Sequence, residues 1–295
     1  MIINKLKDNE YKVQIANKSK LNLIGNLIIN SRNSTFNRRL LIICHGLLDT
    51  KESPVIDYIQ NAIFTYENSS FDILKFDFAG NGESEGMTTY SDYPGQVEDL
   101  KDWIDAFQNK TIELPSSKGE DSYRFTVDVV SGHSKGGTVV MLYASKYPEI
   151  ENIINLSGRC KLQECSLHRF KKEQLKQLEE VGKFKWKQMA SSVTPEHIRD
   201  VYVLASDFDW RQKFDYECYK AILNNPNRLV HTIHGTKDSV VPYEDAIMFD
   251  QLVKPSHILH SIKDAGHVFN SEAEQLELKS CLHKCLDNLK HSVKL

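Results

Sequence analysis

The sequence contains no apolar run that approaches the length of a membrane-spanning helix, which needs about 20 residues. Its first residues, MIINKLKDNEYK, lack the apolar stretch of a secretion signal. The six cysteines are scattered and form neither a CxxC pair nor the dense framework of a small disulfide-rich protein. We therefore expect free thiols in a reducing compartment, and predict a cytoplasmic protein without an integral membrane segment.

An excess of charge of one sign is also missing. The chain has 37 Lys and Arg against 40 Asp and Glu, which leaves a formal net charge of −3. This balance gives no reason to expect nucleic acid or an anionic membrane as a partner. A hydrophobic content of 40% and a charged content of 26% are typical of globular proteins, and 295 residues suit one α/β domain with an insertion.

Short apolar runs alternate with segments of helical spacing along most of the chain. After an opening hairpin, the pattern predicts strands at 40–44, 71–78, 125–130, 150–156, 228–233 and 256–262. Helices are predicted at 54–64, 97–107, 139–147 and 273–293. The alternation indicates an α/β fold with a doubly wound, mainly parallel sheet, in which ligands bind beyond the carboxyl ends of the strands.

Two stretches depart from this alternation. Residues 111–123 are polar and are predicted to be an excursion before the next strand. Residues 159–213 are charged, with interspersed aromatics, and predict helices at 173–181 and 194–203. We therefore divide the chain into a first part of the core (1–158), a helical lid inserted over the site (159–213) and a second part of the core (214–295).

The segment FTVDVVSGHSKGGTVVMLYA, residues 125–144, combines a buried strand, a serine between glycines and a helix. A strand can turn directly into a helix only with strained backbone and very small neighbours, which Gly132 and Gly136 provide. The turn presents a hydroxyl at the edge of the sheet, next to the free N–H groups of the helix start. This order predicts a nucleophile elbow with Ser134 as the nucleophile.

A second Gly-x-Ser-x-Gly match surrounds Ser84, but two glutamates flank that serine and no helical pattern follows it. We interpret Ser84 as part of a polar loop, since carboxylates would oppose a developing oxyanion. The glycines at 80 and 82 resemble a dinucleotide motif, yet Glu85 occupies the place of the pyrophosphate. His231 and His234 show no third metal ligand. We expect neither a metal nor another cofactor.

A serine nucleophile needs a base, usually a histidine, which a carboxylate orients. Of eleven histidines, His267 is preferred because it follows the last predicted strand in a glycine-containing loop. Asp238 follows the preceding strand and is the preferred acid. Asp264 is too close to His267 along the same loop, and Asp207 and Asp209 fall in the inserted segment.

These residues together resemble the α/β-hydrolase superfamily over nearly the whole chain, and more narrowly its feruloyl/cinnamoyl-esterase-like and monoacylglycerol-lipase-like serine hydrolases. The order Ser134, Asp238, His267 is the order of that superfamily. The segments that carry the resemblance are His45-Gly46-Leu47 with Lys51-Glu52-Ser53, residues 77–84, residues 132–137, residues 234–238 and Gly266-His267.

The resemblance implies that the main-chain N–H groups of Leu47 and Lys135 form an oxyanion hole. Lys135 departs from the Gln, Met or Leu more usual after the serine, and we expect its side chain to face solvent. The resemblance further implies a serine hydrolase that cleaves a carboxylic ester, or a thioester, of a small or medium acyl group. An amidase or peptidase with the same triad and a non-catalytic binding protein of this fold are the alternatives.

Several basic residues of the inserted segment remain without an assigned role. We interpret them first as a solvated helical face; the alternative is attraction of an anionic acyl substrate or of a thioester of a phosphorylated carrier. They are Arg169, Lys171, Lys172, Lys176, Lys183, Lys185 and Lys187.

Overall fold

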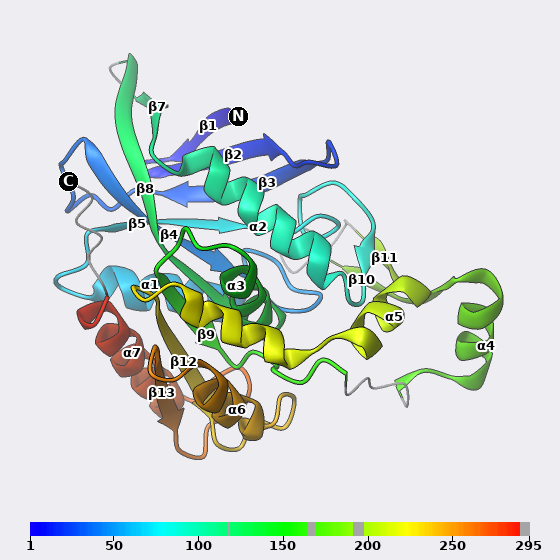
Figure 1. The fold of residues 1–295 in the computed structure, drawn as a ribbon. Coiled ribbons are helices and arrows are strands. Elements are labelled where there is room, and N and C mark those ends of the chain that lie inside the picture. Colours follow the sequence, from blue (N-terminus) through cyan, green and yellow to red (C-terminus); the bar gives the residue numbers. More distant parts are fainter. Residues whose placement is uncertain (117–118, 164–168, 191–197, 290–295) are drawn as a thin grey trace.

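The computed structural model describes residues 1–116, 119–163, 169–190 and 198–289, and one large β-sheet forms its centre (Figure 1). The strands lie in the order β1-β2-β3-β5-β4-β8-β9-β12-β13, with β7 paired to β8. The strands from β5 to β13 run parallel to one another, whereas β1, β2 and β3 add an antiparallel edge. The doubly wound α/β sheet predicted from the sequence is confirmed.

The central strands are buried on both faces, as expected for strands that are covered by helices on either side. Their burial confirms this arrangement: β5, β9 and β12 are buried throughout their length. The strands of the sheet are β1 (Ile2–Lys7), β2 (Glu10–Ala16), β3 (Asn22–Ile28), β4 (Asn37–Cys44), β5 (Phe71–Phe76), β7 (Lys110–Ser116), β8 (Gly119–His133), β9 (Asn152–Leu156), β12 (Leu229–Gly235) and β13 (His257–Ile262).

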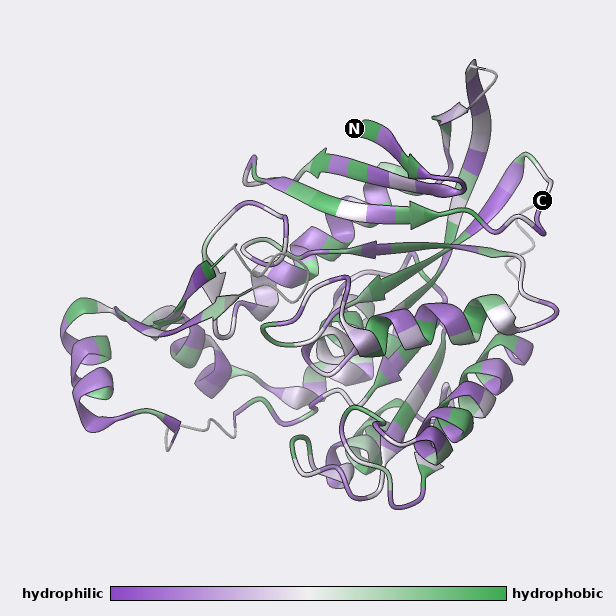
Figure 2. Cartoon of the chain, turned by 180° about the vertical axis from the view of Figure 1, so that it is seen from behind, coloured by the Kyte–Doolittle hydropathy of each residue, from purple (hydrophilic) through white to green (hydrophobic). Residues whose placement is uncertain are grey.

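Helices cover both faces of the sheet and bury two separate hydrophobic clusters. One face carries α1 (Pro54–Thr65) and α7 (Glu272–Asp287), which lie in front of the sheet in the rear view of Figure 2. The other face carries α2 (Tyr93–Phe107), α3 (Lys135–Lys146), α6 (Tyr243–Val253) and the 3-10 segment η2 (Tyr216–Asn224). None of the helices in the described part of the chain is both long and apolar enough to cross a bilayer.

The polar excursion expected at 111–123 is largely a β-hairpin. Strand β7 pairs antiparallel with an extension of β8, which begins at Gly119 and so is much longer than the predicted strand at 125–130. The outer half of β8 is mainly exposed and polar, which hides its strand character from a reading based on apolar runs.

The inserted segment is not purely helical, so that part of the sequence-based expectation is wrong. The helix predicted at 173–181 is present as α4 (Lys172–Val181). The helix predicted at 194–203 is instead, from Ile198 onward, strand β11 (Ile198–Leu204); residues 194–197 lie outside the described residues. Val201 and Val203 are buried at alternate positions, which is the period of a strand.

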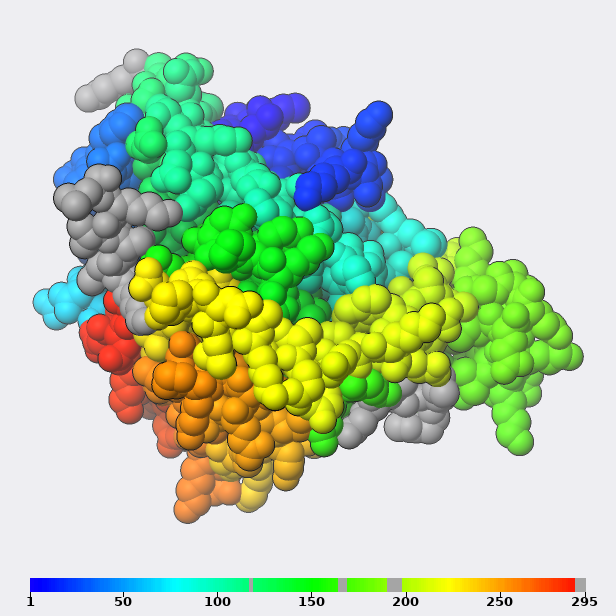
Figure 3. Space-filling view, viewed as in Figure 1, coloured from blue at the N-terminus to red at the C-terminus, as the bar shows by residue number. Residues whose placement is uncertain are grey.

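Strand β11 pairs antiparallel with β10 (Lys183–Ala190) and parallel with the short β6 (Thr88–Thr89), and helix α5 (Ala205–Lys213) follows it. These elements have a small aromatic cluster of their own, built around Tyr90, Phe170, Phe184 and Phe208. Leu47, from the loop after β4, packs against this cluster. Helix α4 projects to one side of the molecule (Figure 3), while α5 lies against the sheet domain near the carboxyl ends of its strands (Figure 1).

Candidate active site

Ser134 lies at the junction of β8 and α3, at the carboxyl edge of the sheet. Its backbone has φ 57°, a value that non-glycine residues adopt rarely and that functional sites retain under strain. A Cβ atom on Gly132 would lie 2.3 Å from the main chain of Gly136, and one on Gly136 would lie 2.4 Å from the carbonyl of Cys44. The sharp turn therefore requires both glycines.

The structure brings together the three side chains that the sequence singled out. His267 Nε2 lies 2.9 Å from the Oγ atom of Ser134, and His267 Nδ1 lies 2.7 Å from an Oδ2 atom of Asp238. Asp238 follows β12 and His267 follows β13, two neighbouring parallel strands. A Cβ atom on Gly235 would lie 2.3 Å from the carbonyl of Ala265, so close packing of the two loops sets the Asp238–His267 contact.

Asp238 is held as a carboxylate. Burial raises its pKa, but hydrogen bonds from His234 and His267 and from the main-chain N–H of Val241 outweigh burial and hold the pKa well below the ordinary value. Oδ1 accepts from the N–H groups of Val240 and Val241, each at 2.8 Å. The side chain can therefore accept a hydrogen bond from the Nδ1–H group of His267 and fix the orientation of that ring.

His133, to which the sequence analysis assigned no role, positions His267 through a hydrogen bond to its main chain. Its Nε2 donates to the main-chain oxygen of His267 at 2.9 Å. Burial, followed by the nearby His267, lowers the pKa of His133 to about 4, so this ring is neutral at pH 7. The one feature of the sequence that could have indicated this role is the position of His133 directly before Ser134 in the elbow.

Leu47 and Lys135 line the same cavity as Ser134, a space of about 70 Å³. Lys135 opens α3, so its N–H is one of those that have no acceptor within the helix. The loop that carries Leu47 approaches closely, since a Cβ atom on Gly46 would lie 3.3 Å from the Cβ of Ser134. His45 holds this loop by donating from Nδ1 to the Gly46 oxygen and accepting the Phe78 N–H at Nε2.

The side chain of Lys135 does not face solvent, and that expectation is wrong. Lys135 is only 5% exposed, and its Nζ lies 5.1 Å from the centroid of the Tyr93 ring. Nζ has no hydrogen-bond partner among the described residues. Burial lowers the pKa of Lys135 to about 8, in spite of the nearby Asp92 and Asp207, which raise it. Elements distant in sequence, α2 and α5, cover this position.

Replacement of Lys135 by methionine is expected to stabilise the folded protein by about 3 kcal/mol at pH 7, because a buried ammonium without a paired carboxylate is removed. The pKa is lower in the folded chain than in the unfolded one. The cost is therefore fully present below pH 8 and disappears as the pH rises past 10.5. Urea unfolding at pH 7 and at pH 10 measures the difference in free energy of unfolding between the variant and the wild type at each pH. A variant less stable than the wild type at pH 7 would contradict the prediction.

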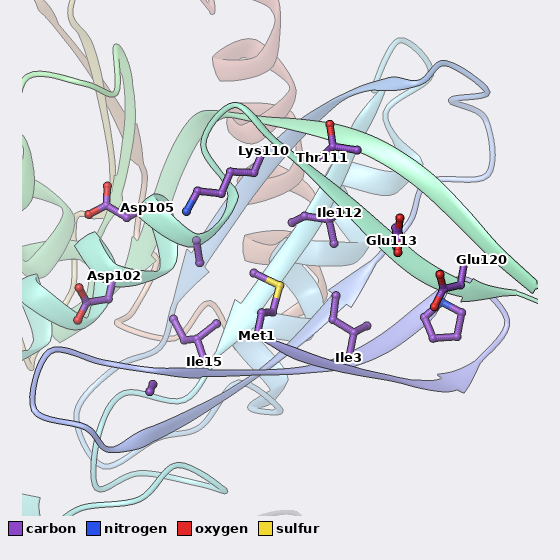
Figure 4. Close-up of a pocket in the computed structure, with 13 residues that line it drawn as sticks. Met1, Ile3, Ile15, Asp102, Asp105, Lys110, Thr111, Ile112, Glu113 and Glu120 are labelled. Atoms are coloured by element: carbon purple, nitrogen blue, oxygen red, sulfur yellow. The ribbon is translucent and has the colours of Figure 1, made fainter.

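A cavity larger than the one beside Ser134 lies apart from it, and the two histidines of β12 that the sequence suggested as metal ligands point away from each other. A cavity of about 780 Å³ lies between β1, the end of α2 and the β7–β8 hairpin (Figure 4), and neither Ser134 nor His267 lines it. His231 and His234 lie three residues apart on β12 and so point to opposite faces of the sheet.

His231 belongs instead to a buried cluster with His260 and Cys285 on the α7 side of the sheet. His231 Nδ1 lies 3.0 Å from His260 Nε2, and Cys285 Sγ lies 3.7 Å from the same nitrogen. Burial, followed by His260 and His257, lowers the pKa of His231 to about 3. A hydrogen bond between two neutral imidazoles accounts for the short contact, and burial raises the pKa of the Cys285 thiol.

Comparison with known proteins identifies the family of the chain. The family model described as serine aminopeptidase, S33, a hydrolase family, matches residues 36–274. The chain belongs to this hydrolase family. No curated protein matches the sequence.

Solved structures similar to this S33 hydrolase establish the α/β-hydrolase fold that the sequence predicted. Est1E from Butyrivibrio proteoclasticus, solved with ferulic acid, is 19% identical, with 94% of this chain and 98% of that chain covered and a TM-score of 0.66. The esterase Pf2001 of Pyrococcus furiosus is 18% identical, with 98% and 97% covered and a TM-score of 0.64. Mouse α/β-hydrolase domain-containing protein 10 is 16% identical, with 95% and 99% covered and a TM-score of 0.61.

Proposed function

We propose that this S33 hydrolase is a serine esterase that cleaves a carboxylic ester, or a thioester, of a small or medium acyl group through an acyl-enzyme. The observation that carries the proposal is the continuous chain of contacts from Asp238 through His267 to Ser134, at 2.7 and 2.9 Å, beside a small cavity. Nucleophile, base and orienting carboxylate are the three groups that acyl transfer by a serine requires.

In the first half of the reaction, His267 Nε2 takes the proton of Ser134 as Oγ forms a bond to the ester carbonyl carbon. The negative charge that develops on the carbonyl oxygen is stabilised by the N–H groups of Leu47 and Lys135. His267 then gives its proton to the departing alcohol oxygen, or thiol sulfur, as the bond from that atom to carbon breaks. Asp238 stays ionised and keeps the Nδ1 proton in place.

In the second half, His267 takes a proton from water as the water oxygen attacks the acyl-enzyme. The tetrahedral intermediate collapses, the proton returns to Ser134 Oγ, and the acid leaves. We propose that residues 159–213 form the lid of this site, because Arg169 and Arg211 of that segment line the cavity together with Ser134.

An aminopeptidase, the activity in the family's description, is a second candidate with the same chemistry. Such an enzyme must bind the ammonium group of its substrate, for which a carboxylate is the natural partner. The described residues that line the cavity beside Ser134 include no Asp or Glu. The lining therefore favours an ester over a peptide with a free amino terminus.

Labelling with a fluorophosphonate probe and turnover of p-nitrophenyl acetate and butyrate test the proposal. We expect rapid labelling and faster hydrolysis of these esters than of the matched p-nitroanilides, since an activated serine reacts with both the probe and an ester. Faster cleavage of the anilides would identify an amidase or peptidase instead. A folded protein that neither takes the label nor turns over any substrate would be a binding protein of this fold.

A further inference from the structure

The walls of the cavity beside Ser134 are strongly cationic. Four basic side chains line it, and the described residues of the lining include no carboxylate. The basic residues come from four places in the chain: the start of α3, the segment after β9, the part of the insert before α4, and α5. They are Lys135, Arg159, Arg169 and Arg211.

Among these four residues, Lys135 gives the strongest indication of an anionic ligand, because it lies next to the nucleophile and is only 5% exposed. Its Nζ has no hydrogen-bond partner among the described residues. Asp92 and Asp207 lie near enough to raise its pKa, but neither forms a hydrogen bond with it. A buried cation without a paired anion is costly to the fold. The buried ammonium therefore does not stabilise the fold, and a bound anion would give it a hydrogen-bonded partner.

Arg159 is fixed at the cavity by a main-chain contact. Its Nη2 donates to the carbonyl oxygen of Val240 at 2.6 Å, and Val240 itself lines the cavity. A neutral carbonyl orients the guanidinium and leaves its full positive charge. Arg169 is exposed and lies at the edge of the same lining, and Arg211 is buried and donates from Nε to the Leu162 oxygen at 2.9 Å.

The basic residues of the insert that lie away from the cavity behave differently. Lys171, Lys172, Lys176, Lys183, Lys185 and Lys187 are all exposed. Lys185 pairs with Asp200 and Lys176 with Glu180 on the surface. These lysines are exposed to solvent, as expected from the sequence, but Lys183, Lys185 and Lys187 lie on strand β10 and not on a helix. The positive charge that bears on a substrate therefore comes from the cavity residues.

We propose that the ester cleaved by this protein carries a carboxylate, which binds to Lys135 and Arg159, with Arg169 at the entrance, while the ester carbonyl lies against Ser134. The inference rests on the proposed function and specifies its substrate class. The cavity is small, about 70 Å³, which favours a short carboxylate-bearing chain. The carboxylate belongs to the acyl part or to the alcohol part of the ester.

Two matched pairs of substrates test the proposal and distinguish these two sources. The acyl pair is p-nitrophenyl hydrogen adipate and p-nitrophenyl methyl adipate. The alcohol pair is m-carboxyphenyl butyrate and its methyl ester. For the wild type we expect kcat/KM for the anionic member to exceed that for its neutral partner by about tenfold or more in one pair, as expected for hydrogen bonds to charged groups.

Lys135→Met and Arg169→Gln should each lower this anionic-to-neutral ratio severalfold, whatever happens to the absolute rate. Lys176→Met is the matched control, because it removes one positive charge from an exposed position of the insert. Its ratio should equal that of the wild type. Arg169 is exposed, so its variant keeps the test valid if Lys135→Met does not fold.

Ratios of one or less for both pairs, in a protein that takes the fluorophosphonate label and hydrolyses the neutral esters, would overturn the carboxylate inference and leave the esterase proposal intact. An equal loss of the ratio in Lys176→Met and Lys135→Met would also overturn it, since the effect would then come from net charge. Absence of both labelling and ester turnover would instead refute the proposed function itself.

Discussion

Replacement of Ser134 by alanine is expected to lower kcat/KM for p-nitrophenyl butyrate by about 10⁴-fold or more, and to abolish labelling by a fluorophosphonate. The side chain removed is the one whose Oγ lies 2.9 Å from His267 Nε2. Without it no acyl-enzyme forms, and only the binding groups and N–H donors of the cavity remain. Steady-state kinetics, with circular dichroism to verify folding, measure the effect.

The chain offers a matched control in Ser84, the serine of its second Gly-x-Ser-x-Gly segment. Ser84 is fully buried, donates to the Asp77 oxygen at 2.6 Å and accepts the Ile24 N–H at 2.9 Å. Ser84→Ala should cost about 1–3 kcal/mol of stability, because two buried groups lose a partner, and should keep the activity. Loss of activity in Ser84→Ala with retention in Ser134→Ala would reverse our assignment of the nucleophile.

Replacement of Asp238 by asparagine is expected to lower kcat by about 10⁴-fold near neutral pH. The asparagine oxygen can still accept from the N–H groups of Val240 and Val241, which now bond to Oδ1. The amide group would then face His267 and favour the ring tautomer with its proton on Nε2, which cannot take the proton of Ser134. Loss of the pre-steady-state burst that we expect of the wild type with p-nitrophenyl acetate would show that acylation is the step that slows.

Asp264→Asn is the control for this experiment, since Asp264 is the other carboxylate close to His267 in sequence. It is exposed and pairs with Lys237 at 3.0 Å, outside the hydrogen-bond chain of the site. We expect activity near that of the wild type, because an exposed ion pair contributes little. A large loss in Asp264→Asn with little effect in Asp238→Asn would identify a different acid.

The parts of the site that could be predicted from the sequence share a local cause. The turn at Ser134 needs glycines at fixed neighbouring positions, and the sequence shows them. Asp238 and His267 each follow a short apolar strand, and the carboxyl ends of parallel strands meet at one edge of a sheet. Local pattern and topology together are sufficient to predict that these side chains lie near each other.

The expectations that failed depend on contacts between distant segments. Residues 198–204 read equally well as a charged helix and as an alternating strand, and pairing with β10 and β6 selects the strand. The outer half of β8 is polar, so only its pairing with β7 shows that it is extended. His133 gains its role because the loop after β13 places the His267 oxygen 2.9 Å from its ring.

The sequence by itself determined the α/β sheet, the elbow at Ser134 and the order of the three residues proposed to act there, because glycine requirements and hydrophobic periodicity act over a few neighbouring residues. Only the tertiary structure decided the environment of Lys135. Helices α2 and α5 enclose its ammonium beside Tyr93, and the chain after β9 adds Arg159 to the same cavity. Burial and charge at a site depend on which distant segments pack against it, and no local pattern contains that information.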